Sequence, residues 1–397
     1  MKVSRRSHVP PFAVMEVLAA ANARRDAGES VLNLCAGEPA TGASDVVRRR
    51  AIDLLESGDL GYTEAMGVPA LRQAIADHYE RTYGVVVDPA RVAVTTGSSG
   101  GFMLAFLAAF DAGDRVALAR PGYPAYRNIL AALGCEVVEL DCGPETRYQP
   151  TVSQLMEAYY EGGLDGLVIA SPANPTGTMI PPTELAALSA WCTDHDVRLV
   201  SDEIYHGIVY ADPASPAGET ATAAQYLDDG AVVVNSFSKY WAMTGWRLGW
   251  LLLPEDLVGA VDALAGNIAL SPPALAQHAG VAAFSPEGYA AAAENVARYA
   301  GSRALVLDRL DDLGWDPVAP ADGAFYVYAN VAASGLDSVT WCERLLADTG
   351  VALTPGTDFD GVRGGEWVRL SFAAAPEVVA EAVDRIVAWR AAGYRRV

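Results

Sequence analysis

From about residue 91 onward, short runs of β-branched and other apolar residues alternate with stretches of helical pattern. Strands that alternate with helices are joined by crossover connections, which produce a mainly parallel sheet buried on both faces. A helix over 183–194 is one of the connections. The predicted strands cover residues 91–95, 115–118, 136–140, 167–170, 197–201 and 232–235.

Both ends of the chain have a different pattern. Residues 13–27 and 70–83 are predicted helices, and Gly84 is a typical helix-ending residue. After Pro286 an alanine-rich helix is expected over 289–313, followed by a strand at 323–329, a helix at 338–349, a strand at 367–372 and a helix at 376–390. We therefore expect an α/β fold, with a large domain over 46–285 around a mainly parallel sheet. A smaller α+β domain is expected to be built from residues 1–45 and 286–397.

The charge and the cysteines exclude several classes of protein. A formal net charge of −21 disfavours nucleic-acid binding, which depends on Lys and Arg contacts to phosphate. The five cysteines are scattered, so neither a metal site nor a disulfide framework is expected, and free thiols favour a cytoplasmic location. Arg5 and Arg6 superficially match a twin-arginine export signal, but the apolar stretch that should follow is interrupted by prolines and Glu16. No run of about 18 apolar residues predicts a membrane span.

Lysine is almost absent from this chain. It occurs only as Lys2 and Lys239, whereas the other basic residues are arginines. Arginine stays protonated in proteins, so it cannot act as a nucleophilic amine. A lysine with a lowered pKa can, and it then forms Schiff bases with carbonyl compounds. Either Lys239 persists by chance or it is retained for this chemistry.

Polar residues follow the predicted strands where they end, and ligands of open α/β sheets bind at the carboxyl ends of the strands. A glycine/serine turn over 97–101 follows the first strand and offers N–H groups and hydroxyls that suit a phosphate. Taken singly, each of these residues is also compatible with an ordinary turn or helix cap. The others are Asn174, Asp202 and Lys239, each just after a strand, and Arg247 eight residues beyond Lys239.

Together, these groups match the needs of one cofactor. An amine for an imine, a carboxylate for a ring nitrogen and a phosphate-binding turn describe a site for pyridoxal phosphate (PLP). The lysine would carry the cofactor and shuttle a proton. The carboxylate would keep the ring nitrogen protonated, which makes the ring an electron sink.

The chain also resembles the fold-type I, PLP-dependent class I/II aminotransferases, the aspartate aminotransferase superfamily. The resemblance extends from about Val9 to the last helix. It implies the PLP-dependent transferase fold, an amino acid and a 2-oxo acid as substrates, and a homodimer with shared active sites. The segments that carry it are 37–39, 61–63, 67, 71–72, 121–124, 174–177, 202–205, 236–239, 244–249 and 369–372.

The resemblance assigns a role to each of these residues. Lys239 forms the internal aldimine, Asp202 pairs with the ring nitrogen, and Tyr205 acts with them. Arg369 grips the substrate α-carboxylate through a bidentate fork, near the backbone of Gly37. The remaining residues contact the cofactor: Asn174 and Tyr205 at the ring oxygen, Tyr123 on the ring face, Ser98, Ser99, Gly100, Ser236, Ser238 and Arg247 around the phosphate, and Tyr62 from the other subunit. Asn174 is also expected beside the substrate.

The expected amino donor is neutral, apolar or aromatic. Relatives specific for dicarboxylates carry a second cation, either a lysine in the phosphate turn or a partner arginine, and here residues 98–100 and 267–273 contain no basic residue. An unpaired substrate carboxylate in a closed pocket would be costly. Phe12, Val14 and Met15 are expected to form an apolar wall. Two alternatives to an aminotransferase stay open: a PLP-dependent β-lyase or elimination enzyme on the same scaffold, and a non-catalytic PLP-binding regulator.

Overall fold

A computed structural model describes residues 1–58, 60–210 and 220–395. Its centre is a seven-stranded sheet with the strand order β2-β8-β7-β6-β5-β3-β4. Six of these strands match predicted strands to within two residues at each end. The strands are β2 (Val92–Thr95), β3 (Arg115–Arg120), β4 (Glu136–Asp141), β5 (Gly166–Ala170), β6 (Arg198–Asp202), β7 (Val232–Ser236) and β8 (Gly249–Leu252).

Strand direction in this sheet is mainly parallel. Strands β4, β3, β5, β6 and β7 pair in parallel, whereas β8 is antiparallel to both β7 and β2. Because β8 runs the other way, its first residue, Gly249, pairs with Ser236 and Thr95, the last residues of its neighbours. The sequence did not predict β8. The expected α/β fold with a mainly parallel sheet is confirmed.

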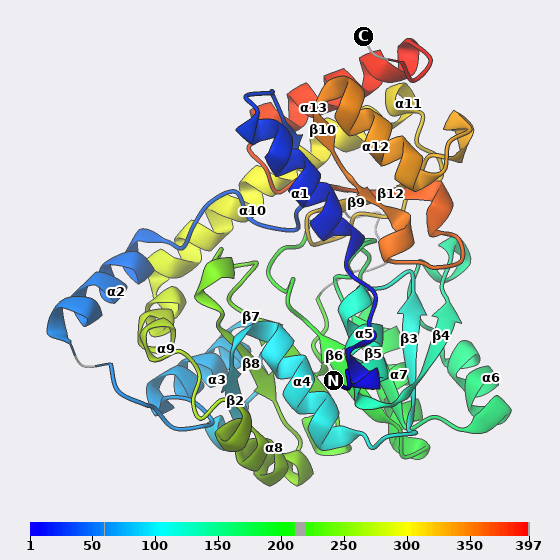
Figure 1. Ribbon diagram of the computed structural model, residues 1–397. Helices are drawn as coiled ribbons and strands as arrows, with labels where there is room; N and C mark the ends of the chain where they lie inside the picture. The colour runs from blue at the N-terminus through cyan, green and yellow to red at the C-terminus, as the bar shows by residue number, and fades with distance from the viewer. Residues whose placement is uncertain (59, 211–219, 396–397) are drawn as a thin grey trace.

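Both faces of the sheet are buried, as the continuous apolar strands predict. Val232 and Val234 of β7 pack in one cluster with Phe102, whereas Val233 packs in another with Leu185. Figure 1 shows helices in front of the sheet and behind it. The first face is covered by α4 (Gly97–Ala109), α5 (Pro124–Leu133) and α8 (Glu255–Ile268). The second is covered by α2 (Asp45–Ser57), α3 (Pro69–Tyr83), α6 (Val152–Gly162), α7 (Pro182–Asp194) and α9 (Ala274–Gly280).

The two ends of the chain come together in a second core, at the top of Figure 1. Here β1 (Leu32–Asn33) pairs in parallel with β10 (Val351–Ala352), and β11 (Thr354–Pro355), β12 (Trp367–Ser371) and β9 (Tyr326–Asn330) form an antiparallel sheet. The division into domains at residues 45 and 285 stays a prediction. The helices of this part are α1 (Ala13–Asp26), α10 (Pro286–Leu307), α11 (Leu310–Leu313), α12 (Ser338–Thr349) and α13 (Pro376–Ala391).

Two predicted elements were wrong in detail. Residues 97–101 are not a turn but the start of α4, where Gly101 lets the helix approach the sheet: a Cβ there would come within 3.3 Å of Leu251 and Val234. The single helix expected over 289–313 is divided, because α10 ends at Leu307 and the short α11 follows. Across residues 1–58, 60–210 and 220–395, no helix has the length and apolar character needed to cross a membrane.

Candidate active site

A cavity of about 270 Å³ lies at the edge of the large sheet where its parallel strands end. This edge is where ligands of open α/β sheets bind. The smaller sheet completes the cavity, since Tyr326 and Arg369 come from β9 and β12. The cavity is lined by Val14, Gly37, Ser98, Ser99, Tyr123, Tyr126, Ala170, Pro172, Asn174, Asp202, Ile204, Tyr205, Ser238, Lys239, Thr244, Arg247, Tyr326 and Arg369.

Lys239 enters this cavity from the segment that follows β7. Its Nζ donates a hydrogen bond to the backbone oxygen of Gly37, which follows β1 in the sequence. Burial, and then the positive charge of Arg369, lower the pKa of Lys239 to about 8. A substantial fraction of this amine is therefore neutral near physiological pH, and the neutral form is the nucleophile.

Asp202 is the last residue of β6, and its carboxylate is buried in the cavity wall. One oxygen, Oδ1, accepts a hydrogen bond from the backbone N–H of Ile204 at 3.0 Å, and Oδ2 accepts one from the hydroxyl of Tyr126. Burial raises the pKa of the Asp202 carboxyl to about 7, while these two hydrogen bonds act in the opposite direction. A buried carboxylate of this kind is stabilised by a cation or strong donor in the cavity.

Hydroxyls and a guanidinium gather at the start of α4. Ser98 and Ser99 lie in the first turn of this helix, whose N-terminal N–H groups and dipole attract anions. Arg247 follows the 3₁₀ turn Thr244–Trp246, just before β8, and its guanidinium packs so closely on Gly97 that a Cβ there would collide with it. The antiparallel direction of β8 brings Arg247 to this edge of the sheet.

Two tyrosines join the large sheet to the small one. The hydroxyls of Tyr205, which follows β6, and Tyr326, the first residue of β9, lie 2.6 Å apart. The Tyr326 hydroxyl also abuts Gly37, where a Cβ would overlap it. Tyr123, which also lines the cavity, immediately precedes α5, and Phe12 stacks on its ring at a centroid distance of 6.2 Å.

Arg369 is held flat between two aromatic rings. The guanidinium carbon lies 4.5 Å from the ring centroid of Tyr326 and 4.8 Å from that of Phe359. Nη1 donates to Asn174 Oδ1 at 2.8 Å, and Nη2 donates to the backbone oxygen of Cys35 at 2.6 Å. Among the described residues, Nε has no hydrogen-bond partner although it is buried. The guanidinium is therefore oriented, with N–H groups left for a carboxylate.

Most of the predicted site residues lie together in this cavity, but some do not. Ser236 is buried outside the lining, and its hydroxyl accepts a hydrogen bond from the backbone N–H of Ser238 at 3.1 Å. Gly100 lies in the first turn of α4 outside the lining. Tyr62 is 86% exposed and does not line the cavity of its own chain. The roles of these residues stay predictions.

Sequence reasoning missed several residues of the cavity. Tyr126 lies one helical turn after Tyr123, and this i,i+3 spacing predicts that the two side chains lie on the same face of the helix. Tyr326 carried no such sign, nor did Phe359, which lies against Arg369 outside the lining, because their contacts with Tyr205 and Arg369 join distant parts of the chain. Thr244, Pro172 and Ile204 also line the cavity.

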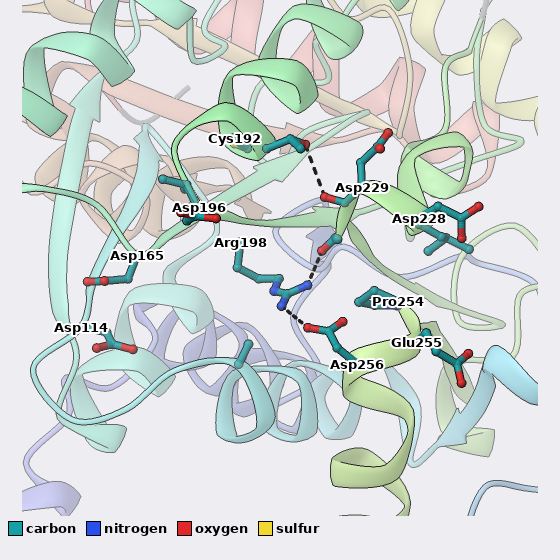
Figure 2. Close-up of a pocket in the computed structure, with 15 residues that line it drawn as sticks. Asp114, Asp165, Cys192, Asp196, Arg198, Asp228, Asp229, Pro254, Glu255 and Asp256 are labelled. Atoms are coloured by element: carbon teal, nitrogen blue, oxygen red, sulfur yellow. Dashed lines mark hydrogen bonds and ion pairs between the residues drawn. The ribbon is translucent and has the colours of Figure 1, made fainter.

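A larger cavity, of about 700 Å³, lies at the opposite edge of the sheet (Figure 2). Its wall includes Asp165 and Arg198, at the amino ends of β5 and β6, and Arg198 forms an ion pair with Asp256 at 2.5 Å. It holds neither Lys239 nor the other groups described above, so it is not the candidate active site. Within the part of the chain described, no group of three or more acidic, His or Cys side chains is arranged to hold a metal ion.

Comparison with known proteins identifies the family. The profile of aminotransferase class I and II matches residues 29–386. The valine–pyruvate aminotransferase of Mycobacterium tuberculosis is 57% identical over 389 residues, which are 98% of each chain. The aspartate/prephenate aminotransferase of Thermus thermophilus is 34% identical over 377 residues, 94% of this chain and 95% of that one.

The structural comparison agrees. A crystal structure of an aminotransferase from Mycobacterium tuberculosis has a TM-score of 0.95 and 56% sequence identity, and the match covers 99% of this chain and 100% of that one. Both comparisons extend over nearly the whole sequence, and they confirm the resemblance found in the sequence. The chain therefore belongs to the class I and II aminotransferase family and is an enzyme of that class.

Proposed function

We propose that this enzyme uses pyridoxal phosphate to move an amino group from a neutral, apolar donor such as valine to a 2-oxo acid such as pyruvate. Members of the family depend on this cofactor. The observation that carries the proposal is the cavity itself, which joins Lys239 and Asp202 to the guanidinium of Arg369, and this guanidinium has no acidic partner among the described residues.

The residues present fit the cofactor. Within residues 1–58, 60–210 and 220–395 the buried carboxylate of Asp202 forms no ion pair, so it suits a protonated ring nitrogen, and the amine of Lys239 suits an aldehyde. Ser98, Ser99 and Arg247 offer hydroxyls, helix N–H groups and a positive charge to a phosphate. When bound, pyridoxal phosphate supplies a ring that withdraws electrons from the substrate α-carbon.

The protein's own groups then have distinct tasks. Lys239 would take the proton from the substrate α-carbon and return it at the end of the transfer, a task that suits an amine with a pKa near 8. Asp202 would keep the ring nitrogen protonated. Tyr205 and Asn174 would donate hydrogen bonds to the ring oxygen, Tyr123 would cover a face of the ring, and Ser238 would join the phosphate site.

Arg369 would bind the α-carboxylate that every donor and acceptor shares, beside the backbone of Gly37 and the amide of Asn174. The basic side chains in the lining are Lys239, Arg247 and Arg369, and each already has a task. A second carboxylate on the donor would thus lack a cation, whereas Val14 offers apolar contact.

The relatives support this choice of reaction and donor. The relative that shares 57% identity is a valine–pyruvate aminotransferase, whereas the aspartate/prephenate enzyme shares only 34%. These names describe amino-group transfer, so they favour it over elimination on the same scaffold.

We include a homodimer in the proposal. Tyr62, at 86% exposure, is available to reach the phosphate site of a partner subunit. Apolar side chains are also exposed on α2 and after α8, including Ile52, Leu55 and Leu270. Burying such side chains against a second copy would be favourable. The predicted cytoplasmic location rests on the free cysteines and stays a prediction.

The test is to incubate the purified enzyme and pyridoxal phosphate with valine and pyruvate, and to follow alanine and the 2-oxo acid of valine by chromatography. The two products should form in equal amounts. Lys239→Ala should abolish them, and Lys239→Arg, which keeps the charge but cannot act as a base, should fail equally. If no alanine forms from valine and pyruvate, whereas an amino acid with a β leaving group, such as O-acetylserine, releases ammonia and pyruvate, the enzyme catalyses elimination and the proposal is refuted.

A further inference from the structure

The start of helix α1 lies against the candidate active site through a buried carboxylate. Asp358, 5% exposed, is the last residue of the 3₁₀ turn Gly356–Asp358. Its Oδ1 accepts a hydrogen bond from the backbone N–H of Ala13 at 3.0 Å, and its Oδ2 accepts one from the N–H of Val14 at 3.3 Å. The first N–H groups of a helix have no partner within the helix, so a carboxylate there stabilises its end.

This cap comes from a distant part of the chain because α1 does not cap itself. The residue before the helix is Phe12, which offers no side-chain hydrogen bond. Ala21 is the only fully buried residue of α1, and Val14, Val17 and Leu18 are half-buried against the small cluster that contains it. Beyond this packing, the beginning of α1 is held by Asp358 and by the stacking of Phe12 on Tyr123.

Asp358 is itself anchored to the wall of the cavity. The guanidinium of Arg127, in α5, donates to the backbone oxygen of Asp358 at 2.8 Å, and the N–H of Gly122 donates to that of Phe359 at 3.1 Å. Phe359 lies over the guanidinium of Arg369. One short segment thus joins the start of α1, the end of α5 that faces the cavity and the arginine proposed to bind carboxylates.

The backbone segment that Asp358 binds carries the apolar side chains that lie at the cavity. Val14 lines it directly, and Phe12 covers Tyr123, which also lines it. In Figure 1 the blue segment before α1 runs from the small sheet down to α5. We infer that Asp358 is a positioning residue that sets donor selectivity, because it keeps Val14 and Phe12 at the cavity as an apolar wall. This inference rests on the proposed function.

The experiment compares two variants that each remove an aspartate cap from a helix. Asp358→Ala removes the cap of α1, whereas Asp337→Ala removes the cap of α12. Asp337 accepts a hydrogen bond from the N–H of Thr340 at 3.0 Å and does not line the cavity. Both are assayed as holoenzymes with valine and with alanine as donors and with 2-oxobutyrate as the common acceptor, because alanine and pyruvate would only regenerate each other. The kcat/KM ratio of valine to alanine should fall about tenfold in Asp358→Ala, because valine loses apolar contacts that alanine does not need. It should stay within about twofold in Asp337→Ala, and Asp358→Asn, which keeps one acceptor, should lie in between.

A second measurement does not depend on catalysis. Amide hydrogen exchange over residues 13–17 should be about tenfold faster in Asp358→Ala and unchanged in Asp337→Ala, because the cap protects the first turn. An unchanged exchange rate, or faster exchange with an unaltered valine-to-alanine ratio, would overturn the inference. If the wild-type enzyme transfers the amino group of neither donor, the proposed function fails and the selectivity argument fails with it. The exchange rate would still show whether Asp358 holds α1.

Discussion

Removing the Tyr126 hydroxyl should make the enzyme lose activity at neutral pH and regain part of it at higher pH. This hydroxyl donates to Oδ2 of Asp202, and the only other donor to that carboxylate among the described residues is the N–H of Ile204, on Oδ1. Asp202 must be ionised to keep a ring nitrogen protonated. The hydrogen bond from Tyr126 lowers the pKa of Asp202 against the effect of burial, so Tyr126→Phe raises that pKa.

The magnitude follows from the kind of bond that is lost. A hydrogen bond to a charged group contributes about 1.5–3 kcal/mol, and one pKa unit corresponds to about 1.4 kcal/mol. The pKa of Asp202, about 7 before the change, should therefore rise by about one to two units. The ionised fraction at pH 7 then falls from about one half to between about one tenth and one hundredth, so kcat/KM should fall by about 5- to 50-fold there.

The assay is the pH dependence of kcat/KM for valine with pyruvate, together with the dissociation constant of the cofactor at pH 7. The acid side of the profile should move to higher pH by at least about one unit in Tyr126→Phe. Tyr289→Phe is the control, because it removes the hydroxyl of a half-buried tyrosine that lies outside the cavity and hydrogen-bonds His78 at 2.8 Å. A Tyr126→Phe profile that overlays the wild type, with unchanged cofactor affinity, would refute the reasoning.

Three further predictions concern the same site. The neutral amine of Lys239 is the nucleophile, and burial lowers its pKa to about 8. The rate at which the cofactor-free protein binds pyridoxal phosphate covalently should therefore rise with pH up to about 8 and then level off. A flat rate between pH 6 and 9, measured by absorbance, would contradict this. Arg369→Lys keeps the positive charge but loses the bidentate fork and the contacts of the guanidinium with the rings of Tyr326 and Phe359. The kcat/KM should therefore fall about 100-fold for valine and alanine alike. A loss confined to one donor would contradict a role at the α-carboxylate. Mixing inactive Lys239→Ala chains with inactive Tyr62→Ala chains should restore up to about a quarter of the activity if sites are shared between subunits. No recovery of activity in refolded mixtures, or an active monomer in sedimentation, would contradict the dimer.

The sequence alone determined the large sheet and the edge at which the site lies. Strands buried on both faces must be apolar throughout, so they stand out from the helices between them. Because parallel strands all end at one edge, Asp202 after one strand and Lys239 after another were expected to lie close together, and they line the same cavity. Lys239 was further marked by the near absence of lysine elsewhere.

Local pattern was insufficient where packing overrides propensity. Strand β8 has only four residues, and such a short apolar run does not reveal that it is antiparallel. The glycines at 97–101 suggested a turn, yet they begin α4 because the helix must approach the sheet closely at Gly101. Both errors arise where the tertiary environment, rather than intrinsic preference, selects the conformation.

Only the tertiary structure decided how the catalytic groups are held. The hydrogen bond between Tyr126 and Asp202 spans 76 residues, the contact between Tyr205 and Tyr326 spans 121, and that between Ala13 and Asp358 spans 345. No periodicity or spacing encodes pairs so far apart, because the two residues of each pair meet only after the elements that carry them have packed together in the folded chain. The chemistry of the site could therefore be predicted from residue types at strand ends, whereas the orientation and pKa of each group follow from contacts that the complete fold creates.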